Sequence, residues 1–191
     1  LLIDYLNEAG IRDRDITVII AVGAHRQNSE AECVELCTRE IFDRVTVVNH
    51  NAWDHGNMVP YGTTSRGTEV AVNRLVAEAD RVILTGGVIY HYMVGYGGGR
   101  KSLVPGVASR ETCMATHFAI FNPPEQGGRD PRACTANLDG NPVHQATGRE
   151  NKILQIIPAT ALPARPPRAP DTVFPGLTDG HSLGPPKCRP V

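Results

Sequence analysis

The sequence lacks the features that would assign it at once to a membrane or nucleic-acid-binding class. No apolar run reaches the roughly 18 residues that a membrane-spanning helix requires, so we expect no membrane partner. The formal net charge is only −1, from 19 Lys and Arg against 20 Asp and Glu, so no overall field would attract nucleic acid. With 41% hydrophobic residues, the composition is that of an ordinary globular protein.

Paired cysteines are also missing. Cys33 and Cys37 lie four positions apart, while Cys113, Cys134 and Cys188 stand singly. This pattern predicts reduced thiols and a cytoplasmic location rather than a disulfide framework. The sequence begins without an initiator Met or a signal-peptide pattern, so we expect a piece of a longer protein.

Proline divides the chain into two parts of different character. Residues 151–191 contain nine of the 15 prolines and carry a local charge of +3, which leaves −4 for residues 1–150. Proline at this density prevents helices and central strands. We therefore predict one folded domain over residues 1–150 and a proline-rich, irregular or disordered tail over residues 151–191.

The first 150 residues alternate strand and helix patterns. We expect helices over residues 1–9, 29–42, 68–79 and 111–117, and strands over residues 16–22, 45–48 and 81–84. The β-branched run at 16–22 is typical of a strand buried on both faces. Alternation of this kind predicts an α/β fold, a Rossmann-like parallel sheet flanked by helices, whose ligands lie at the carboxyl ends of the strands.

Two candidate residues directly follow the first of these strands, in the turn Gly23-Ala24-His25-Arg26. A histidine can transfer protons near neutral pH, and an arginine can hold a carboxylate or phosphate through two hydrogen bonds. Taken alone, the turn favours a capping histidine and a solvated arginine over a functional pair.

A glycine-rich segment follows the third predicted strand, beginning after His91 and continuing as Gly97-Gly98-Gly99-Arg100-Lys101-Ser102. Consecutive glycines let the backbone approach a ligand, and their amides can form an anion-binding nest. The spacing is not that of a nucleotide-hydrolase phosphate loop. Lys101 is a candidate phosphate contact, a covalent attachment point or a solvated charge.

Two later segments carry weaker signals. His117 closes a predicted helix beginning at Glu111 and is a candidate metal ligand, although HExxH and CxxC motifs are missing. Residues 137–142 contain Asp-Gly and Asn-Pro steps, which favour a plain surface turn. His50, His55 and His144 join no recognisable constellation.

Together these segments resemble the catalytic domain of the nickel-dependent lactate racemase family. The His25 turn is similar to that family's Gly-Thr-His-Arg turn, and Lys101 stands where the family attaches its cofactor. The separations between the four matching residues are also similar: 66 from His25 to His91, 10 to Lys101 and 16 to His117. Further similarity lies in Gly62-Thr-Thr-Ser-Arg-Gly-Thr68, Asn73, Pro105-Gly106 and Gly140-Asn-Pro142.

The resemblance implies a nickel-pincer nucleotide cofactor, a pyridinium mononucleotide that binds Ni(II) through two sulfurs and a carbon. By position, Lys101 would be its covalent tether and His117 the fourth nickel ligand. His25 and His91 would be the catalytic bases and Arg26 a substrate contact. The nucleotide would also be bound by Gly97, Gly98, Gly99, Arg100 and Ser102.

The implied reaction is racemisation or epimerisation of a lactate-like 2-hydroxy acid. A base removes the hydroxyl proton while the α-hydride moves to the cofactor, and a 2-keto acid is the intermediate. The implied partners are the small-molecule substrate and the cofactor-synthesis enzymes. Ala24 departs from the family's Thr. We expect the given sequence to lack the acidic and basic residues that the family has upstream of its first His, and the family's second domain. The alternatives are a catalytically incomplete remnant and a phosphate- or nucleotide-binding module.

Overall fold

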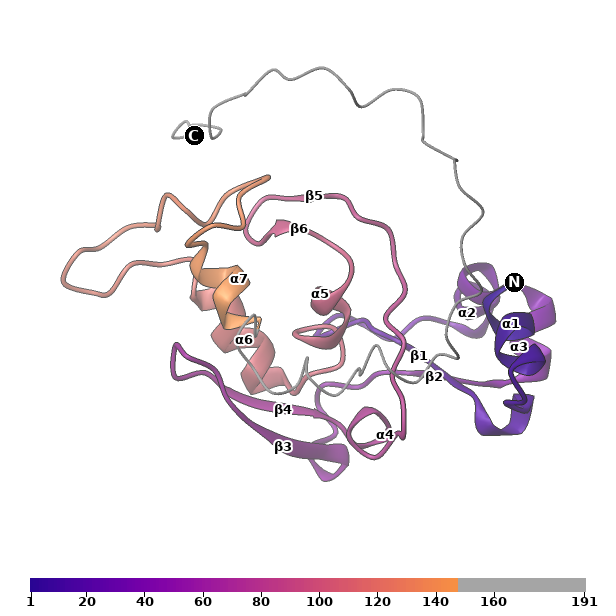
Figure 1. Ribbon diagram of the computed structural model, residues 1–191. Coiled ribbons are helices and arrows are strands. Elements are labelled where there is room, and N and C mark those ends of the chain that lie inside the picture. Colours follow the sequence, from indigo (N-terminus) through magenta and orange to yellow (C-terminus); the bar gives the residue numbers. More distant parts are fainter. Residues whose placement is uncertain (148–191) are drawn as a thin grey trace, which may run out of the picture.

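The computed structural model describes residues 1–147 of the chain (Figure 1). The proline-rich part over 151–191 and the boundary predicted at residue 150 lie outside the described residues. Across residues 1–147, no helix has both the length and the apolar character needed to cross a bilayer.

Short helices and strands alternate along the described chain. The α-helices are α1 (Leu2–Glu8), α2 (Glu30–Cys37), α3 (Arg39–Arg44), α4 (Arg74–Ala77), α5 (Arg100–Leu103), α6 (Arg110–Phe118) and α7 (Pro142–Ala146). The 3-10 helices are η1 (Asp13–Asp15) and η2 (His55–Asn57). The strands are β1 (Thr17–Ile20), β2 (Thr46–Asn49), β3 (Met58–Thr63), β4 (Glu69–Asn73), β5 (Tyr90–His91) and β6 (Gly95–Tyr96).

The strands form separate pairs instead of one sheet. β1 and β2 are parallel, in register from Thr17–Thr46 to Ile20–Asn49. β3–β4 and β5–β6 are antiparallel. The α/β class is therefore confirmed, but the Rossmann-like parallel sheet is reduced, in residues 1–147, to one parallel pair. β1 and β2 are exposed or half-buried along their length, so the prediction of a strand buried on both faces is wrong.

The helix predicted over residues 68–79 is mostly a strand. Residues 69–73 form β4, and only Arg74–Ala77 turn into the short helix α4. Val70 and Val72 alternate with more exposed neighbours and are almost completely buried. This period of two matches a strand, and pairing with β3 decides against the helical alternative.

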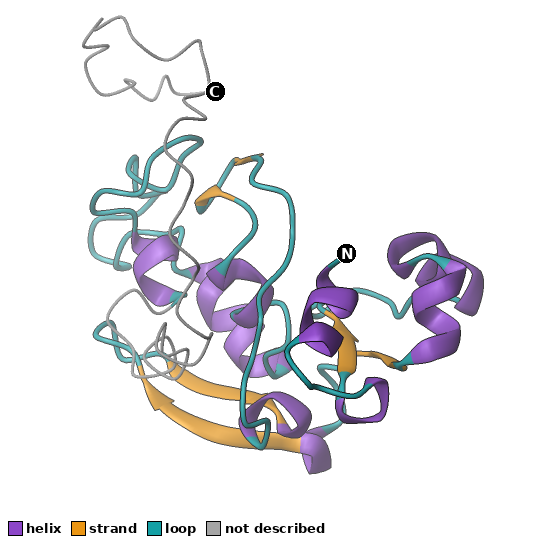
Figure 2. Cartoon of the chain, turned by 45° about the vertical axis from the view of Figure 1, so that its right-hand side comes forward, coloured by secondary structure: helices purple, strands orange, loops and turns teal. Residues whose placement is uncertain are grey.

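Two further predicted elements differ in the structure. Residues 81–84 form no strand, because no neighbouring segment pairs with them; Figure 2 shows the long loop that instead connects α4 with β5. The helix predicted over 29–42 is divided into α2 and α3 at Thr38, whose φ is +72°. Thr38 also accepts a hydrogen bond from the Ile41 amide and so begins α3. The helices predicted at residues 1–9 and 111–117 are confirmed as α1 and α6.

The apolar core lies around β4 and the segment that follows α5. Its largest cluster of buried side chains consists of Val70, Val72, Leu103, Val104 and Val107. A second cluster links the β5–β6 turn to α7 through Met93, Val94, Ala133 and Val143. In Figure 1, α1 to α3 gather at one end of the molecule, while α6 and α7 lie on the other side of α5. The second cluster contains Met93 and Val94, which follow His91 directly in the chain.

Candidate functional site

Three of the predicted site residues meet at one pocket. His91 comes from β5, Lys101 from α5 and His117 from α6. The rest of the lining is apolar or hydroxylic: Met93, Val94, Pro105, Thr116, Val143 and Thr147. Among residues 1–147, no Asp or Glu lines this pocket.

His91 is held by the turn that follows it. Its Nδ1 lies 3.2 Å from the Met93 amide nitrogen and 3.4 Å from that of Val94. The neighbouring Tyr92 ring stacks on it, with centroids 5.0 Å apart. Burial lowers the pKa of His91, and the nearby charges of Lys101 and His117 lower it further. The ring is therefore neutral at neutral pH.

Lys101 is half-buried at the start of α5, and burial lowers the pKa of its ammonium group. The amine must be neutral to attack an electrophile, so this shift favours covalent attachment over simple charge pairing. Arg100 and Ser102 flank Lys101 on the same helix but are not among the residues that line the pocket.

His117 has a defined tautomer. Its Nδ1 lies 2.5 Å from the carbonyl oxygen of Cys113, one turn earlier in α6. Because a carbonyl can only accept a hydrogen bond, Nδ1 carries the hydrogen and Nε2 keeps its lone pair. A backbone carbonyl that fixes the ring in this way is the usual support of a histidine metal ligand. In the described part of the chain, no three His, Cys, Asp or Glu side chains converge as metal ligands.

The three glycines before Arg100 have different reasons to be glycine. Gly98 has a φ of +74°, and a Cβ there would lie 2.7 Å from the carbonyl oxygen of Gly87. A Cβ on Gly97 would lie 3.1 Å from the Ile89 side chain. Gly99 has a φ of +51° and open space around the same position. Only Gly99 thus leaves room beside the backbone for another molecule.

The turn of His25 reaches the other side of the same region. The Gly23 amide donates to the Gly106 carbonyl at 2.8 Å, and the Ala24 amide faces the Cys113 sulfur. Cys113 also interacts electrostatically with Lys101. The His25 side chain is exposed and is not part of the pocket lining. Cys113 therefore links the His25 turn, whose Ala24 amide faces its sulfur, to Lys101 of the pocket.

Arg26, the predicted substrate contact, is engaged elsewhere. Its guanidinium donates two hydrogen bonds, of 2.8 and 2.6 Å, to the Glu32 carboxylate. Together with the Ser29 amide, this pairing lowers the pKa of Glu32 to about 2. Arg26 could bind a substrate carboxylate only by leaving Glu32.

A buried histidine beside the site was missed at the sequence level. His50 is fully buried; its Nε2 lies 2.8 Å from the Ala108 carbonyl oxygen and its Nδ1 3.3 Å from Nδ2 of Asn73. Burial lowers the pKa of His50. His50 follows β2 as the His25 turn follows β1, so the rule that singled out His25 would also have found His50.

Asn141 was missed as well. The sequence favoured a plain surface turn over residues 137–142, yet Asn141 is completely buried. It caps α7 and donates to the Met93 carbonyl at 2.9 Å, next to the turn that holds His91. The Asn-Pro step was a sound signal for the start of α7, because proline is favoured at the first helical position. Burial of the asparagine depends on contacts 48 residues away along the chain.

Comparison with known proteins identifies the family of this chain. A family model described as the lactate racemase N-terminal domain matches residues 1–128. The chain belongs to this family. It is 35% identical to the lactate racemase of Lactiplantibacillus plantarum over 133 residues, which are 70% of this chain and 30% of that protein. The lactate racemase of Thermoanaerobacterium thermosaccharolyticum is 30% identical over 145 residues, which are 76% of this chain and 32% of that protein.

Solved structures give the same relationship. The lactate racemase apoprotein from T. thermosaccharolyticum has a TM-score of 0.63 at 30% identity, covering 70% of this chain and 30% of that one. A Thermotoga maritima protein with a TM-score of 0.56 at 22% identity, covering 81% of this chain and 38% of that one, shares the fold. The chain thus spans about a third of the length of the two lactate racemases that it matches.

Proposed function

We propose that this chain is the cofactor-binding part of a lactate racemase-type isomerase that acts on a 2-hydroxy acid. One observation carries the proposal: His91, Lys101 and His117 line a single pocket, in a chain that belongs to the family. The proposed substrate is a small, lactate-like 2-hydroxy acid, and the proposed partners include the enzymes that synthesise the cofactor. A cytoplasmic location is part of the same proposal.

The residues present fit a nickel-pincer nucleotide. His117 offers Nε2 with its lone pair free, as a metal ligand requires. Lys101 has a lowered pKa and is suited to covalent attachment. Gly99 leaves open space beside the backbone, next to Arg100 and Ser102. When bound, this cofactor supplies the site that accepts and returns the α-hydrogen of the substrate.

The protein's own contribution is proton transfer and orientation. His25 and His91 are the proposed pair that exchanges the hydroxyl proton, one for each enantiomer. Arg26 would bind the substrate carboxylate if it exchanged Glu32 for the substrate. Met93, Val94 and Val143 make one wall of the pocket apolar, which strengthens these electrostatic contacts by excluding water.

The first test is the mass and nickel content of the 191-residue chain after co-expression with the cofactor-synthesis enzymes. We expect an adduct on Lys101 and about one nickel per chain, the stoichiometry of a single metal site. Lys101→Arg should retain the fold and lose the adduct, because arginine cannot form the covalent link. His117→Gln should retain the adduct and lose nickel. A folded wild-type chain without adduct would contradict the cofactor assignment.

Turnover is tested separately, by following the interconversion of D- and L-lactate. His25→Ala and His91→Ala should each abolish racemisation while nickel remains bound. Normal turnover by either variant would show that the two-base assignment is wrong.

A second candidate function has support from Arg26 and His25. Arg26 is paired with Glu32, and the His25 side chain lies outside the pocket lining. This arrangement favours a catalytically incomplete relative that still binds a phosphate or nucleotide through its cationic pocket. It predicts nucleotide binding that survives His117→Gln, with no racemisation by the wild-type chain.

A further inference from the structure

Asn141 uses all the hydrogen-bonding capacity of its side chain without contacting the pocket. Its Oδ1 accepts from the amides of Val143 and His144, at 3.0 and 3.1 Å, and so begins α7. Its Nδ2 donates to the carbonyls of Met93 and Asn137, at 2.9 and 3.0 Å. The residue is completely buried, so water cannot replace any of these four bonds.

The Met93 end of this network bears directly on His91. The amides of Met93 and Val94 point to Nδ1 of the His91 ring. Because an amide N–H can only donate, Nδ1 must be the acceptor and carry no hydrogen. In the neutral ring, the hydrogen is therefore on Nε2, the nitrogen left available to the pocket.

The turn that carries these amides is fixed from several sides. Met93 and Val94 are buried against Val143 of α7. Arg129 donates to the Tyr92 carbonyl at 2.6 Å. A Cβ on Gly95 would overlap the backbone of Asn137, the residue whose carbonyl also accepts from Asn141. Asn141 is the one side chain among these that bonds both to this turn and to the Asn137 loop opposite it.

The Nε2–H tautomer is specific to His91, because His117 has the opposite one. The two rings line the same pocket, but His117 has its hydrogen on Nδ1 and His91 on Nε2. The pocket therefore offers one imidazole lone pair, suited to a metal, and one imidazole N–H, suited to an oxygen acceptor.

We propose that Asn141 is a positioning residue that fixes His91 in the Nε2–H tautomer by holding the Met93–Val94 turn. In this state His91 donates a hydrogen bond to a substrate oxygen. Nε2 can accept a proton only when the ring hydrogen has moved to Nδ1. The amides of Met93 and Val94 must therefore first release Nδ1. That the acceptor is a substrate oxygen rests on the proposed function. The tautomer itself rests only on the two amides that face Nδ1.

The experiment is nitrogen-15 NMR of the histidine rings in the full 191-residue chain, at a pH above the ordinary histidine range. His91→Gln and His117→Gln assign the two rings. We expect an unprotonated Nδ1 and a protonated Nε2 for His91, and the reverse for His117. A scalar coupling between His91 Nδ1 and the amide of Met93 or Val94 would identify the hydrogen bond directly. A wild-type His91 with its hydrogen on Nδ1 would overturn the proposal, whether or not any variant folds.

Asn141→Ser tests the positioning role. Serine caps helices about as well as asparagine, but it has no amide group to donate to Met93. We expect His91 to become a mixture of tautomers while His117 stays unchanged. Asn141→Asp, which also caps but cannot donate, should have the same effect. If either variant folds and retains a pure Nε2–H signal, Asn141 does not fix the tautomer.

The matched control is Asn49→Ser, which removes another amide-to-carbonyl bond, from Asn49 to Asn28 at 3.0 Å. This residue lies in β2, so the His91 signals should not move. A shift as large as that of Asn141→Ser would mean that general loosening, not loss of the Met93 contact, controls the tautomer. A chain that gives the expected NMR result but no racemisation would contradict the proposed function alone.

Discussion

Two regions of this molecule are held together by different kinds of polar contact. Residues 1–49 depend on charged side chains at the surface. Residues 50–147, which contain the pocket, depend on buried uncharged groups that bond to the backbone. The difference teaches where the protein tolerates change, because water can replace a lost contact at the surface but not in the interior.

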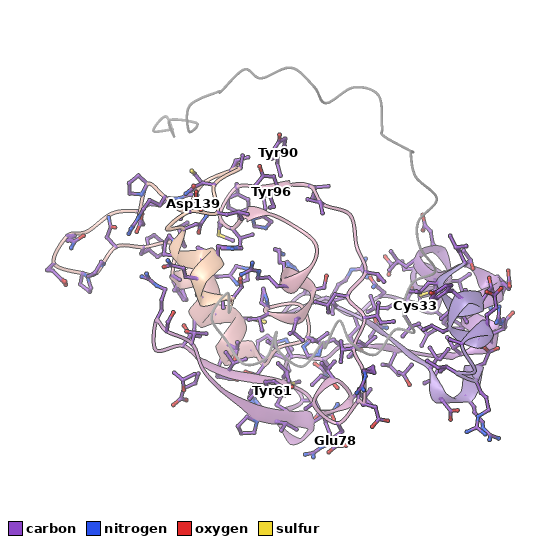
Figure 3. All side chains as sticks on the ribbon, in the orientation of Figure 1. Cys33, Tyr61, Glu78, Tyr90, Tyr96 and Asp139 are labelled. Atoms are coloured by element: carbon purple, nitrogen blue, oxygen red, sulfur yellow. The ribbon has the colours of Figure 1, made fainter. Side chains whose placement is uncertain are left out.

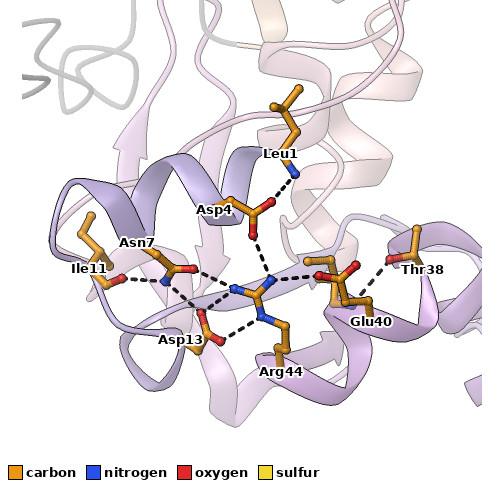
Figure 4. A network of polar contacts seen from close by, with 9 residues as sticks. Leu1, Asp4, Asn7, Ile11, Asp13, Thr38, Glu40 and Arg44 are labelled. Carbon is orange, nitrogen blue, oxygen red and sulfur yellow. Dashed lines mark hydrogen bonds and ion pairs between the residues drawn. The ribbon is translucent and has the colours of Figure 1, made fainter.

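Arg44 is the centre of the first region. As Figure 4 shows, its guanidinium reaches Asp4 and Asn7 of α1, Asp13 of η1 and Glu40 of α3. These contacts join three elements of the chain. Two of the carboxylates, Asp4 and Glu40, are more than half exposed, so solvent screens their interactions.

The second region has its polar groups inside. Side chains of His50, Asn73, Thr112 and Asn141 are almost fully buried and bond to backbone atoms or to one another. Figure 3 shows how densely side chains fill the space around the ribbon in this region, with Tyr90 and Tyr96 together beside β5 and β6. Breaking one of these bonds leaves a buried group without a partner, so the pocket region should be the less tolerant of the two.

The largest expected effect comes from a pair of glycine substitutions with similar backbone angles. Gly95 has a φ of +86° and Gly10 a φ of +91°. Gly10→Ala should cost about 1–2 kcal/mol of unfolding free energy, the penalty of a left-handed alanine. Gly95→Ala adds an overlap with the Asn137 backbone and should cost more than about 3 kcal/mol. Urea unfolding followed by the fluorescence of Trp53, the single tryptophan, measures both. Equal losses would remove the contrast between the regions.

A smaller effect is expected from the buried histidine. His50→Ala should cost about 2–4 kcal/mol of unfolding free energy, because it leaves a cavity and an Ala108 carbonyl that keeps only the weaker Cys113 thiol contact at 3.6 Å. His55→Ala is the control: His55 is exposed, so the substitution should leave the urea midpoint nearly unchanged. A tolerated His50→Ala would contradict the view that the buried network stabilises the pocket.

His50 also predicts the pH dependence of this region. Its folded pKa lies below the ordinary value of 6.5, so the unfolded chain binds more protons near that pH. The contribution of neutral, buried His50 to the free energy of unfolding is therefore fully present above pH 6.5. It is lost as the pH falls from there through the folded pKa. His50→Gln should make this loss smaller, and unfolding curves from pH 7.5 down to about 5 would measure it.

The smallest expected effect is at Arg44. Arg44→Gln should lower the melting temperature less than His50→Ala does, since its partners are screened by solvent. Hydrogen bonds from Arg44 and Asn7 hold the pKa of Asp13 below its usual 3.8. Stability from this contact is therefore present above that pH and is lost as the pH falls through the lower folded pKa. The variant should lose less stability on acidification than the wild type, and thermal unfolding below pH 4 tests this; a steeper acid loss in the variant would contradict the assignment.

Sequence reasoning succeeded where the determinants are local. α1 ends before Gly10, and Ser29 caps the start of α2 with a complete capping box. The end of α1 and the start of α2 are therefore visible in the sequence. It failed where pairing decides. Val70 and Val72 form β4 because β3 lies beside them, and residues 81–84 form no strand because nothing pairs with them.

The grouping of His91, Lys101 and His117 was expected from the resemblance rather than from the predicted sheet. The third strand that should have carried the glycine-rich segment to a common edge does not form, yet these side chains line one pocket. Short elements and the loops between them supply the geometry instead. Asn141 could not have been identified from its turn residues, because its burial depends on Met93 and α7.

The unequal roles of the three glycines have a consequence for recognising distant relatives. At Gly98 any side chain would collide with the backbone of Gly87. Gly99 combines a φ of +51° with a ψ of −125°, which lies outside the left-handed helical region that asparagine adopts, so this position also needs glycine. At Gly97 the atom nearest to an added Cβ belongs to the Ile89 side chain, which can move. A search pattern for this loop should therefore demand glycine at 98 and 99 and admit a small residue at 97. A pattern that weights the whole glycine run uniformly would reject proteins whose loop has the same shape.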